Sequence, residues 1–318
     1  MPEVHSKTGE KVGNTLPISY YHLQTNRLTV AYPGGKMSHL LYLLLLAWIS
    51  VVCLAGEPEH PAFTFHSLPM KEGTVILESS ERTYSMKSSY THDGLEVPYP
   101  DKNQHTTCRQ KTKILSVVGG VITKVEIEYL EYKPEPAESK APEINRSYIV
   151  ELKQGELAIS GSNGHEISKS ERGFLEEHYE LFGHRNGIIF WLDGKSFQPG
   201  QAFDLDKEQT SAIFERKSKL GMNPETMHVT FQSMDNPGRS ELALFDINVH
   251  VKYENQNVQT DGDLTGRTAF DPKTGWAVNL SYEGPIHVRG QVKNSEGIFD
   301  IKGSGETESR SSFTYEIP

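Results

Sequence analysis

The chain contains only two cysteines, Cys53 and Cys108, among its 318 residues. So few cysteines exclude the class of small secreted proteins that several disulfides hold together. Clusters of lysine and arginine are also lacking, and 42 acidic residues against 32 basic ones give a formal charge of −10. Because nucleic acids are bound by grouped cationic side chains, this balance argues against nucleic-acid binding. It also disfavours attachment to anionic lipid surfaces.

The motifs of common catalytic and cofactor sites are missing. The chain has no Gly-x-Ser-x-Gly nucleophile elbow, no His-Glu-x-x-His zinc helix and no phosphate-binding loop. The segment 161–164 is rich in glycine, but it lacks the lysine and the helix start that a phosphate site needs, so it predicts a turn. We therefore expect no cofactor, and the sequence favours a protein that is not an enzyme, with an enzyme as the alternative.

One long apolar run, Leu40–Ala55, has sixteen residues without a charge. It follows Lys36 and ends among small residues, which is the layout of a secretory signal peptide. A membrane-spanning helix needs roughly 20 apolar residues, so the run is short for a permanent anchor. We expect a signal peptide over 37–55, cleaved after Ala55. The alternatives are a retained N-terminal anchor, a lipoprotein acylated at Cys53 and a buried core helix.

The signal segment also predicts the domain organisation. Residues 1–36 are polar and precede it, so we expect Met37 to be the true start and 1–36 to be a non-native, disordered extension. The exported product is then 56–318, a single mainly-β domain of the periplasm, the cell envelope or the medium. This product touches a membrane only through the signal segment before cleavage, and it keeps Cys108 alone, which rules out an intrachain disulfide.

Alternating apolar and polar residues dominate the exported part. In 121–132, for example, Val125 and Ile127 share one face while Lys124 and Glu126 share the other. This period of two is typical of a strand in an antiparallel sheet with one buried face. The segment 283–285 and similar glycine and proline positions predict turns. Further strands are predicted over 74–77, 147–152, 187–192, 227–232, 242–253, 276–282, 286–292, 298–302 and 313–317.

Two helices are marked by capping boxes, in which a side chain at the start and another three residues later bond each other's backbone. Ser168 with Glu171 begins the first, which ends at Gly183, and Asp206 with Gln209 begins the second, which ends at Gly221. Each helix has one apolar stripe, so each is expected to pack on a sheet by one face. The predicted fold is mainly β, either all-β or α+β. It is a curved antiparallel sheet, a half-barrel or a sandwich, with two short helices packed on it.

Candidate metal ligands gather around the first helix, where we single out His165, His178 and His184. Histidine nitrogens bind zinc or copper, but a spacing of six residues does not place His178 and His184 on one helix face. Ordinary imidazoles at the edge of the core are the alternative. Asp204 and Asp206 form an acidic patch that could hold calcium, although it lacks the regular oxygen spacing of a calcium loop.

The long strand over 242–253 supplies the candidate ligand-binding residues. Asp246, Asn248 and His250 alternate with apolar residues and therefore share one face. One interpretation is that this face meets water. The other is that it lines a pocket in which His250 acts as an acid or base beside Asp246.

The segment Gly266–Tyr282 resembles the strand, Asp-x-x-Thr-Gly turn and strand unit of secreted bacterial envelope proteins of uncharacterised function. It also looks like hairpins of periplasmic lipoprotein-carrier folds, in which a curved antiparallel sheet with helices in its concavity encloses an apolar pocket. The resemblance implies binding of acyl chains. The leading hypothesis is therefore an exported, non-enzymatic binding protein for a lipid, another apolar ligand or an envelope partner. The alternative is a hydrolase or metal-dependent enzyme with a site near His165–His184 or at Asp246 and His250.

Overall fold

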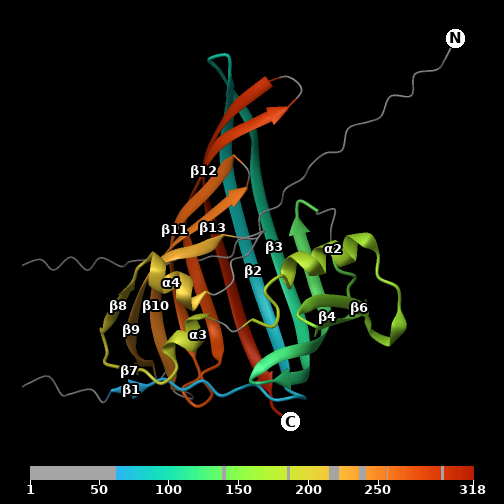
Figure 1. Cartoon of the computed structure of the whole chain (residues 1–318), viewed down its shortest axis with the longest axis vertical. Helices are drawn as coiled ribbons and strands as arrows, with labels where there is room; N and C mark the ends of the chain where they lie inside the picture. The colour runs from blue at the N-terminus through green and yellow to red at the C-terminus, as the bar shows by residue number, and fades with distance from the viewer. Residues whose placement is uncertain are drawn as a thin grey trace, which may run out of the picture.

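One large antiparallel sheet forms the body of the protein, as the computed structural model in Figure 1 shows. The structure describes residues 62–137, 141–184, 187–214, 222–235, 241–255, 257–294 and 297–318. The expected extension over 1–36 and the expected signal peptide over 37–55 lie outside the described residues. The strands are β1 (Phe63–Thr64), β2 (Val75–His92), β3 (Leu95–Val118), β4 (Val121–Glu135), β5 (Ser147–Lys153), β6 (Glu156–Gly161), β7 (Ser196–Phe197), β8 (Ala202–Leu205), β9 (Asn223–Asp235), β10 (Leu242–Asn255), β11 (Val258–Phe270), β12 (Ala277–Asn294) and β13 (Gly297–Glu316).

The sheet has eleven strands in the order β6-β5-β4-β3-β2-β13-β12-β11-β10-β9-β8, and β1 pairs separately with β7. Every pair is antiparallel. The order consists of two meanders, β2 to β6 and β8 to β13, which are joined where β2 pairs with β13. The predicted mainly-β fold with a large antiparallel sheet is thus confirmed.

The described residues form three α-helices, α2 (Lys169–His178), α3 (Gly187–Leu192) and α4 (Lys207–Ile213), and one short 3-10 turn, η1 (Ser162–Gly164). Both predicted capping boxes are present, at Ser168 for α2 and at Asp206 for α4. The prediction of a strand over 187–192 was wrong, because this segment is α3. A short run of consecutive apolar residues has no clear period, so it fits a buried helix as well as a strand.

The predicted turn at 283–285 was also wrong, because these residues lie inside β12. The ladder between β11 and β12 opens here, between the pair Gly262 and Ile286 and the pair Thr265 and Glu283. Pro285, which has no N–H to donate, sits in this opening. The two strands that we predicted over 276–282 and 286–292 are consequently one strand, and those over 298–302 and 313–317 are both parts of β13.

The register shows that all helices lie on the same face of the sheet. One cluster packs α3, α4, β1 and β7 around Phe231 and Phe245, and a second packs α2 on β3 to β6 around Tyr129 and Phe174. We call the face that carries both clusters the inner face and the opposite one the outer face. A single row of neighbouring residues crosses the inner face from the first cluster to the second: Phe231, Phe245, Thr268, Leu280, Ser311, Ser80, Cys108 and Tyr132.

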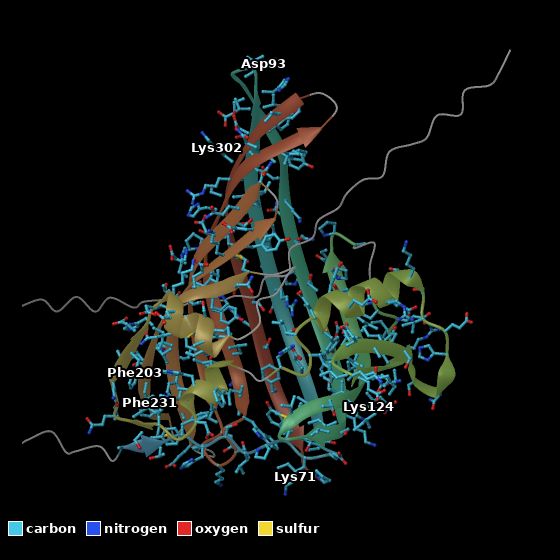
Figure 2. All side chains as sticks on the ribbon, viewed as in Figure 1. Lys71, Asp93, Lys124, Phe203, Phe231 and Lys302 are labelled. Atoms are coloured by element: carbon cyan, nitrogen blue, oxygen red, sulfur yellow. The ribbon has the colours of Figure 1, made fainter. Side chains whose placement is uncertain are left out.

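Four strands extend beyond the helices. β2, β3, β12 and β13 have 18, 24, 18 and 20 residues, far more than the usual five or six. In Figure 1 their upper ends rise above the level of α2, α3 and α4. Figure 2 places Asp93 and Lys302 at this distal end, opposite Lys71 at the base. The inner face of the distal part is therefore left without a helix over it among the described elements.

Candidate functional site

The predicted ligand residues Asn248 and His250 lie on the outer face, beside a hollow between β8 and β11. The Nδ1 atom of His250 lies 2.9 Å from Oδ1 of Asp263 on β11. The predicted partner, Asp246, instead accepts a 2.7 Å hydrogen bond from Nε of Arg267. His250 and Asp246 are each held by a neighbouring strand, so the two are not coupled to one another as the acid-base hypothesis requires.

A second histidine on the same face, His228, was not singled out from the sequence. Its Nδ1 lies 2.7 Å from Oδ1 of Asp204, and its Nε2 lies 3.1 Å from the hydroxyl of Thr230. A carboxylate, an imidazole and a hydroxyl in this order are the elements of a nucleophilic triad. The Asp204 side chain is 90% exposed, so water screens its bond to the imidazole.

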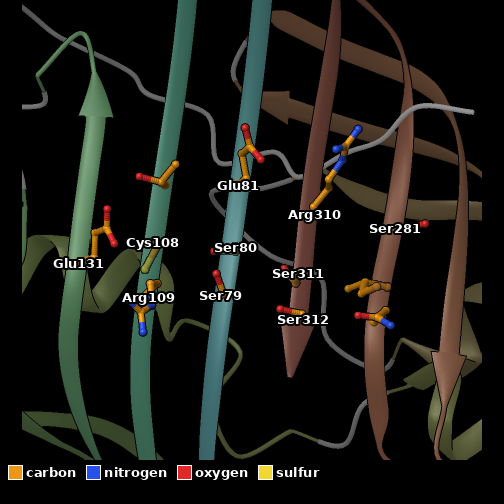
Figure 3. A pocket seen from close by; sticks show the side chains of 13 residues that line it. Ser79, Ser80, Glu81, Cys108, Arg109, Glu131, Ser281, Arg310, Ser311 and Ser312 are labelled. Carbon is orange, nitrogen blue, oxygen red and sulfur yellow. The ribbon is translucent and has the colours of Figure 1, made fainter. Parts of the chain in front are cut away.

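The centre of the outer face is a shallow polar hollow across β4, β3, β2, β13 and β12 (Figure 3). Glu131, Arg109, Glu81 and Arg310 bring two negative and two positive charges to it. Serines from three of these strands separate the charged side chains, as the labels of Figure 3 show. With charges of both signs and no aromatic ring, this surface fits a solvated sheet face.

The three candidate metal histidines do not form a common site in the described part of the chain. His165 donates from Nδ1 to the carbonyl of Ser162 at 2.7 Å, and His178 does the same to the carbonyl of Phe174 at 3.1 Å. His184 is exposed after the end of α2. No group of three histidine, cysteine, aspartate or glutamate side chains among the described residues is placed to hold a metal ion.

The two aspartates of the expected calcium patch are likewise occupied by other contacts. Asp206 caps α4 by accepting from the backbone N–H of Gln209 at 2.9 Å. Asp204 contacts His228 on the adjacent strand. Their carboxylates therefore point to separate partners.

The distal inner face, by contrast, is apolar and open. We use this name for the inward side chains of β2, β3, β12 and β13 beyond Arg82. Since β2 and β13 pair without a register shift, alternate residues stay on this face to the tip. The apolar and aromatic members are Tyr84, Met86, Tyr90, Leu95, Val97, Tyr99, Ile286, Val288, Val292, Phe299 and Ile301.

Burial decreases along this face from the body to the tip. Tyr84 and Met86 are 8% and 5% exposed, and they pack with Ile286, Val288 and Met222. Tyr99 is 59% exposed and Leu95 73%. The outer face at the same level is polar, with Gln291 donating to Asp300 at 2.8 Å. Large exposed apolar side chains thus gather on the inner face of the distal sheet, whereas the outer face of its described part carries one, Ile298, which is 55% exposed.

Aromatic rings form a small hollow on the distal inner face. Phe299 stacks on His92 with 4.4 Å between ring centres and meets Tyr90 edge-on at 5.5 Å. The hollow has a volume of about 340 Å³. It is lined by Ser88, Ser89, Tyr90, Tyr99, Val292, Phe299 and Ile301. Sequence reasoning missed most of this site, because only the alternation in 286–292 and 298–302 indicated an apolar face here.

No protein-family model matches the chain, and no curated protein matches it. Among solved structures it is similar to lipovitellin, from a study of lipid–protein interactions in that protein, with a TM-score of 0.30 and 9% identity. The match covers 77% of this chain and 26% of that chain, so the present chain spans about a quarter of lipovitellin. At this TM-score the two backbones differ too much for the likeness to bear on function.

The helices are short. None in the described part of the chain combines the length and the apolar character that a membrane-spanning helix needs.

Proposed function

We propose that this protein is an exported, non-enzymatic binding protein that holds the hydrocarbon part of an amphiphile on the distal inner face. One observation carries the proposal: exposed large apolar side chains form a contiguous group on the inner face of the distal sheet, while its outer face exposes only Ile298 among the described residues. Contiguous exposed apolar surface in soluble proteins marks interaction sites. Export rests on the signal-like run Leu40–Ala55 in the sequence.

The dimensions favour a small amphiphile over a protein partner. Small-molecule sites have volumes of roughly 300 to 1,000 Å³, and the hollow of about 340 Å³ lies within this range. Its aromatic rings offer a flat apolar surface, while Ser88 and Ser89 supply hydroxyls at its border. In the register, one pair, Ser88 and Gly303, lies between the hollow and the buried cluster around Met86 on the same face, so a hydrocarbon chain that passes this pair reaches apolar side chains nearer the body.

Titration of the full chain with Nile red, a neutral apolar dye that fluoresces in apolar surroundings, tests the proposal. The variant combines Leu95→Ser with Tyr99→Ser, two exposed positions whose change leaves the core intact. Loss of this apolar contact area should weaken dye binding about tenfold or more. The matched control is Val118→Ser, since Val118 is 63% exposed at the other end of β3. Equal affinity of the double variant and the unchanged protein would refute the proposal.

A further inference from the structure

The distal inner face ends toward the body at Arg82, one inward position before Tyr84. The Nε atom of Arg82 is buried and makes no hydrogen bond. Within the described ranges Arg82 also forms no ion pair. Since a buried polar group without a hydrogen bond is costly, Nε of the half-buried Arg82 is a donor that lacks an acceptor.

A second polar group without a partner lies next to it. Thr307 on β13 is 3% exposed, and its hydroxyl is buried without a hydrogen bond. The register places Thr307 opposite Tyr84, and Ser309 opposite Arg82. Thr307 and Arg82 are therefore diagonal neighbours on the same face, a relationship with about 7 to 8 Å between Cα atoms. An oxygen atom of a ligand between the two side chains can accept from both.

The charge of Arg82 acts on one carboxyl group of the same strand, that of Glu78, but Glu78 is hydrogen-bonded to a different side chain. Glu78 lies two inward positions below Arg82, and its Oε2 accepts a 2.7 Å hydrogen bond from Nε2 of Gln110. Burial raises the pKa of Glu78, even though the charge of Arg82 and the bond from Gln110 act to lower it. Lys102, with Nζ 5.5 Å from the ring centre of Tyr84, adds a second cation on this part of the face. Two cationic side chains, Arg82 and Lys102, thus lie at the body end of the distal inner face.

We propose that Arg82 and Thr307 form an anion subsite, and that the amphiphile of the distal inner face is a long-chain carboxylic acid. Its carboxylate accepts hydrogen bonds from Nε of Arg82 and from the hydroxyl of Thr307. Its hydrocarbon chain runs from there along the inner face toward the hollow at Tyr90 and Phe299. The inference rests on the proposed function, because it names the ligand class of the same face.

The path between subsite and hollow crosses Tyr84 and Met86, against which Met222 now packs. Methionine is unbranched and adapts to different neighbours, so its side chain can be displaced by a hydrocarbon chain of similar polarity. The bound acid then takes over the contacts that Met222 makes with this buried cluster.

Competition of palmitate, methyl palmitate and hexadecyl phosphate against Nile red on the full chain tests this inference. Palmitate should bind about tenfold more tightly than its uncharged ester, the usual effect of hydrogen bonds to a charged group. Arg82→Met should abolish this preference and leave the ester unchanged, and Thr307→Val should reduce the preference. Arg310→Met, on the outer face of β13, serves as the control with an unchanged preference.

Each result separates the two proposals. If palmitate and the ester bind equally to the unchanged protein, or if Arg82→Met weakens both alike, the anion subsite is refuted while the apolar site stands. If none of the three ligands displaces the dye, both proposals fail. A preference for hexadecyl phosphate over palmitate retains the anion subsite but refutes the carboxylic acid. If Arg82→Met does not fold, Thr307→Val, which keeps the side-chain volume, is measured with the same ligands. An unchanged preference for palmitate over methyl palmitate in Thr307→Val then refutes the anion subsite.

Discussion

The hydroxyl of Tyr148 donates a 2.7 Å hydrogen bond to Oε1 of Glu171, and this bond ties β5 to the first turn of α2. The same hydroxyl accepts from the backbone N–H of Glu143 at 2.8 Å. Oε2 of Glu171 accepts from the backbone N–H of Ser168, which completes the capping box. One buried carboxylate therefore fixes both where α2 begins and how it is anchored to the sheet.

Replacing Tyr148 with phenylalanine should destabilise the fold. The ring is fully buried, so the change leaves the N–H of Glu143 without its acceptor and leaves Oε1 of Glu171 with only the 3.5 Å contact from Arg146. We expect the free energy of unfolding in urea to fall by about 1 to 3 kcal/mol. Tyr99→Phe removes the same hydroxyl from a ring that is 59% exposed and should leave the stability unchanged. Equal effects at both positions would contradict the role of the buried bond.

Acid should weaken the anchor of α2. Burial acts to raise the pKa of Glu171, but the hydrogen bonds from Tyr148 and Ser168 outweigh it and hold the pKa below 4.5. A carboxyl whose pKa is lower in the folded state stabilises the fold above its unfolded pKa and loses this contribution as the pH falls. Urea unfolding below about pH 4.5 should therefore show a loss of stability that is smaller in Glu171→Gln. If Glu171→Gln lost as much stability on acidification as the unchanged protein, Glu171 would not be the source of the acid dependence.

Glu78 should behave in the opposite way. Burial raises its pKa above 4.5, so the folded state disfavours the charged form of this carboxyl group. A raised carboxyl pKa means that stability is lost as the pH rises through the folded value. Glu78→Gln keeps an acceptor for Gln110 and removes the charge, so the variant should unfold at a higher urea concentration than the unchanged protein at pH 7. A lower midpoint would show that Glu78 stabilises the fold as an anion.

Gly266 should not tolerate even a methyl group. A Cβ built at this position of β11 would lie 1.8 Å from the carbonyl oxygen of Ser281 and 2.4 Å from Cβ of Tyr282. The backbone of a central strand cannot move without breaking its ladder, so we expect Gly266→Ala to cost about 1 to 3 kcal/mol in thermal unfolding. Thr265→Ala, the adjacent position on the outer face, is the control. An unchanged melting temperature in Gly266→Ala would contradict the close approach.

Alternation predicted those strands that have one clearly apolar face. β4, β5, β9 and β10 were found this way, and the capping boxes at Ser168 and Asp206 gave the starts of α2 and α4. β3 was missed and only the first residues of β2 were found, because serine, threonine, lysine and tyrosine alternate there without a strong contrast in polarity. Their extended conformation comes from pairing with β13 and β4, which lie elsewhere in the sequence.

The prediction of candidate sites was limited in the same way, because the partners of these residues lie elsewhere in the sequence. Asp246, Asn248 and His250 were correctly placed on one side of one strand, but the partner of His250 is Asp263 and that of Asp246 is Arg267. Side-chain alternation states which residues share a face. It does not state which residue of another strand lies opposite, since that depends on the register between strands.

Local patterns in this chain determined its class. Alternating polarity made it a mainly antiparallel β protein, and two capping boxes started two helices, because hydrogen bonds within a few residues and a period of two act over short distances. Tertiary structure alone decided that all helices cover one half of the inner face and leave the distal half open. It also brought Arg82 beside Thr307, because pairing of the first long strand with the last follows from the folding of the whole sheet.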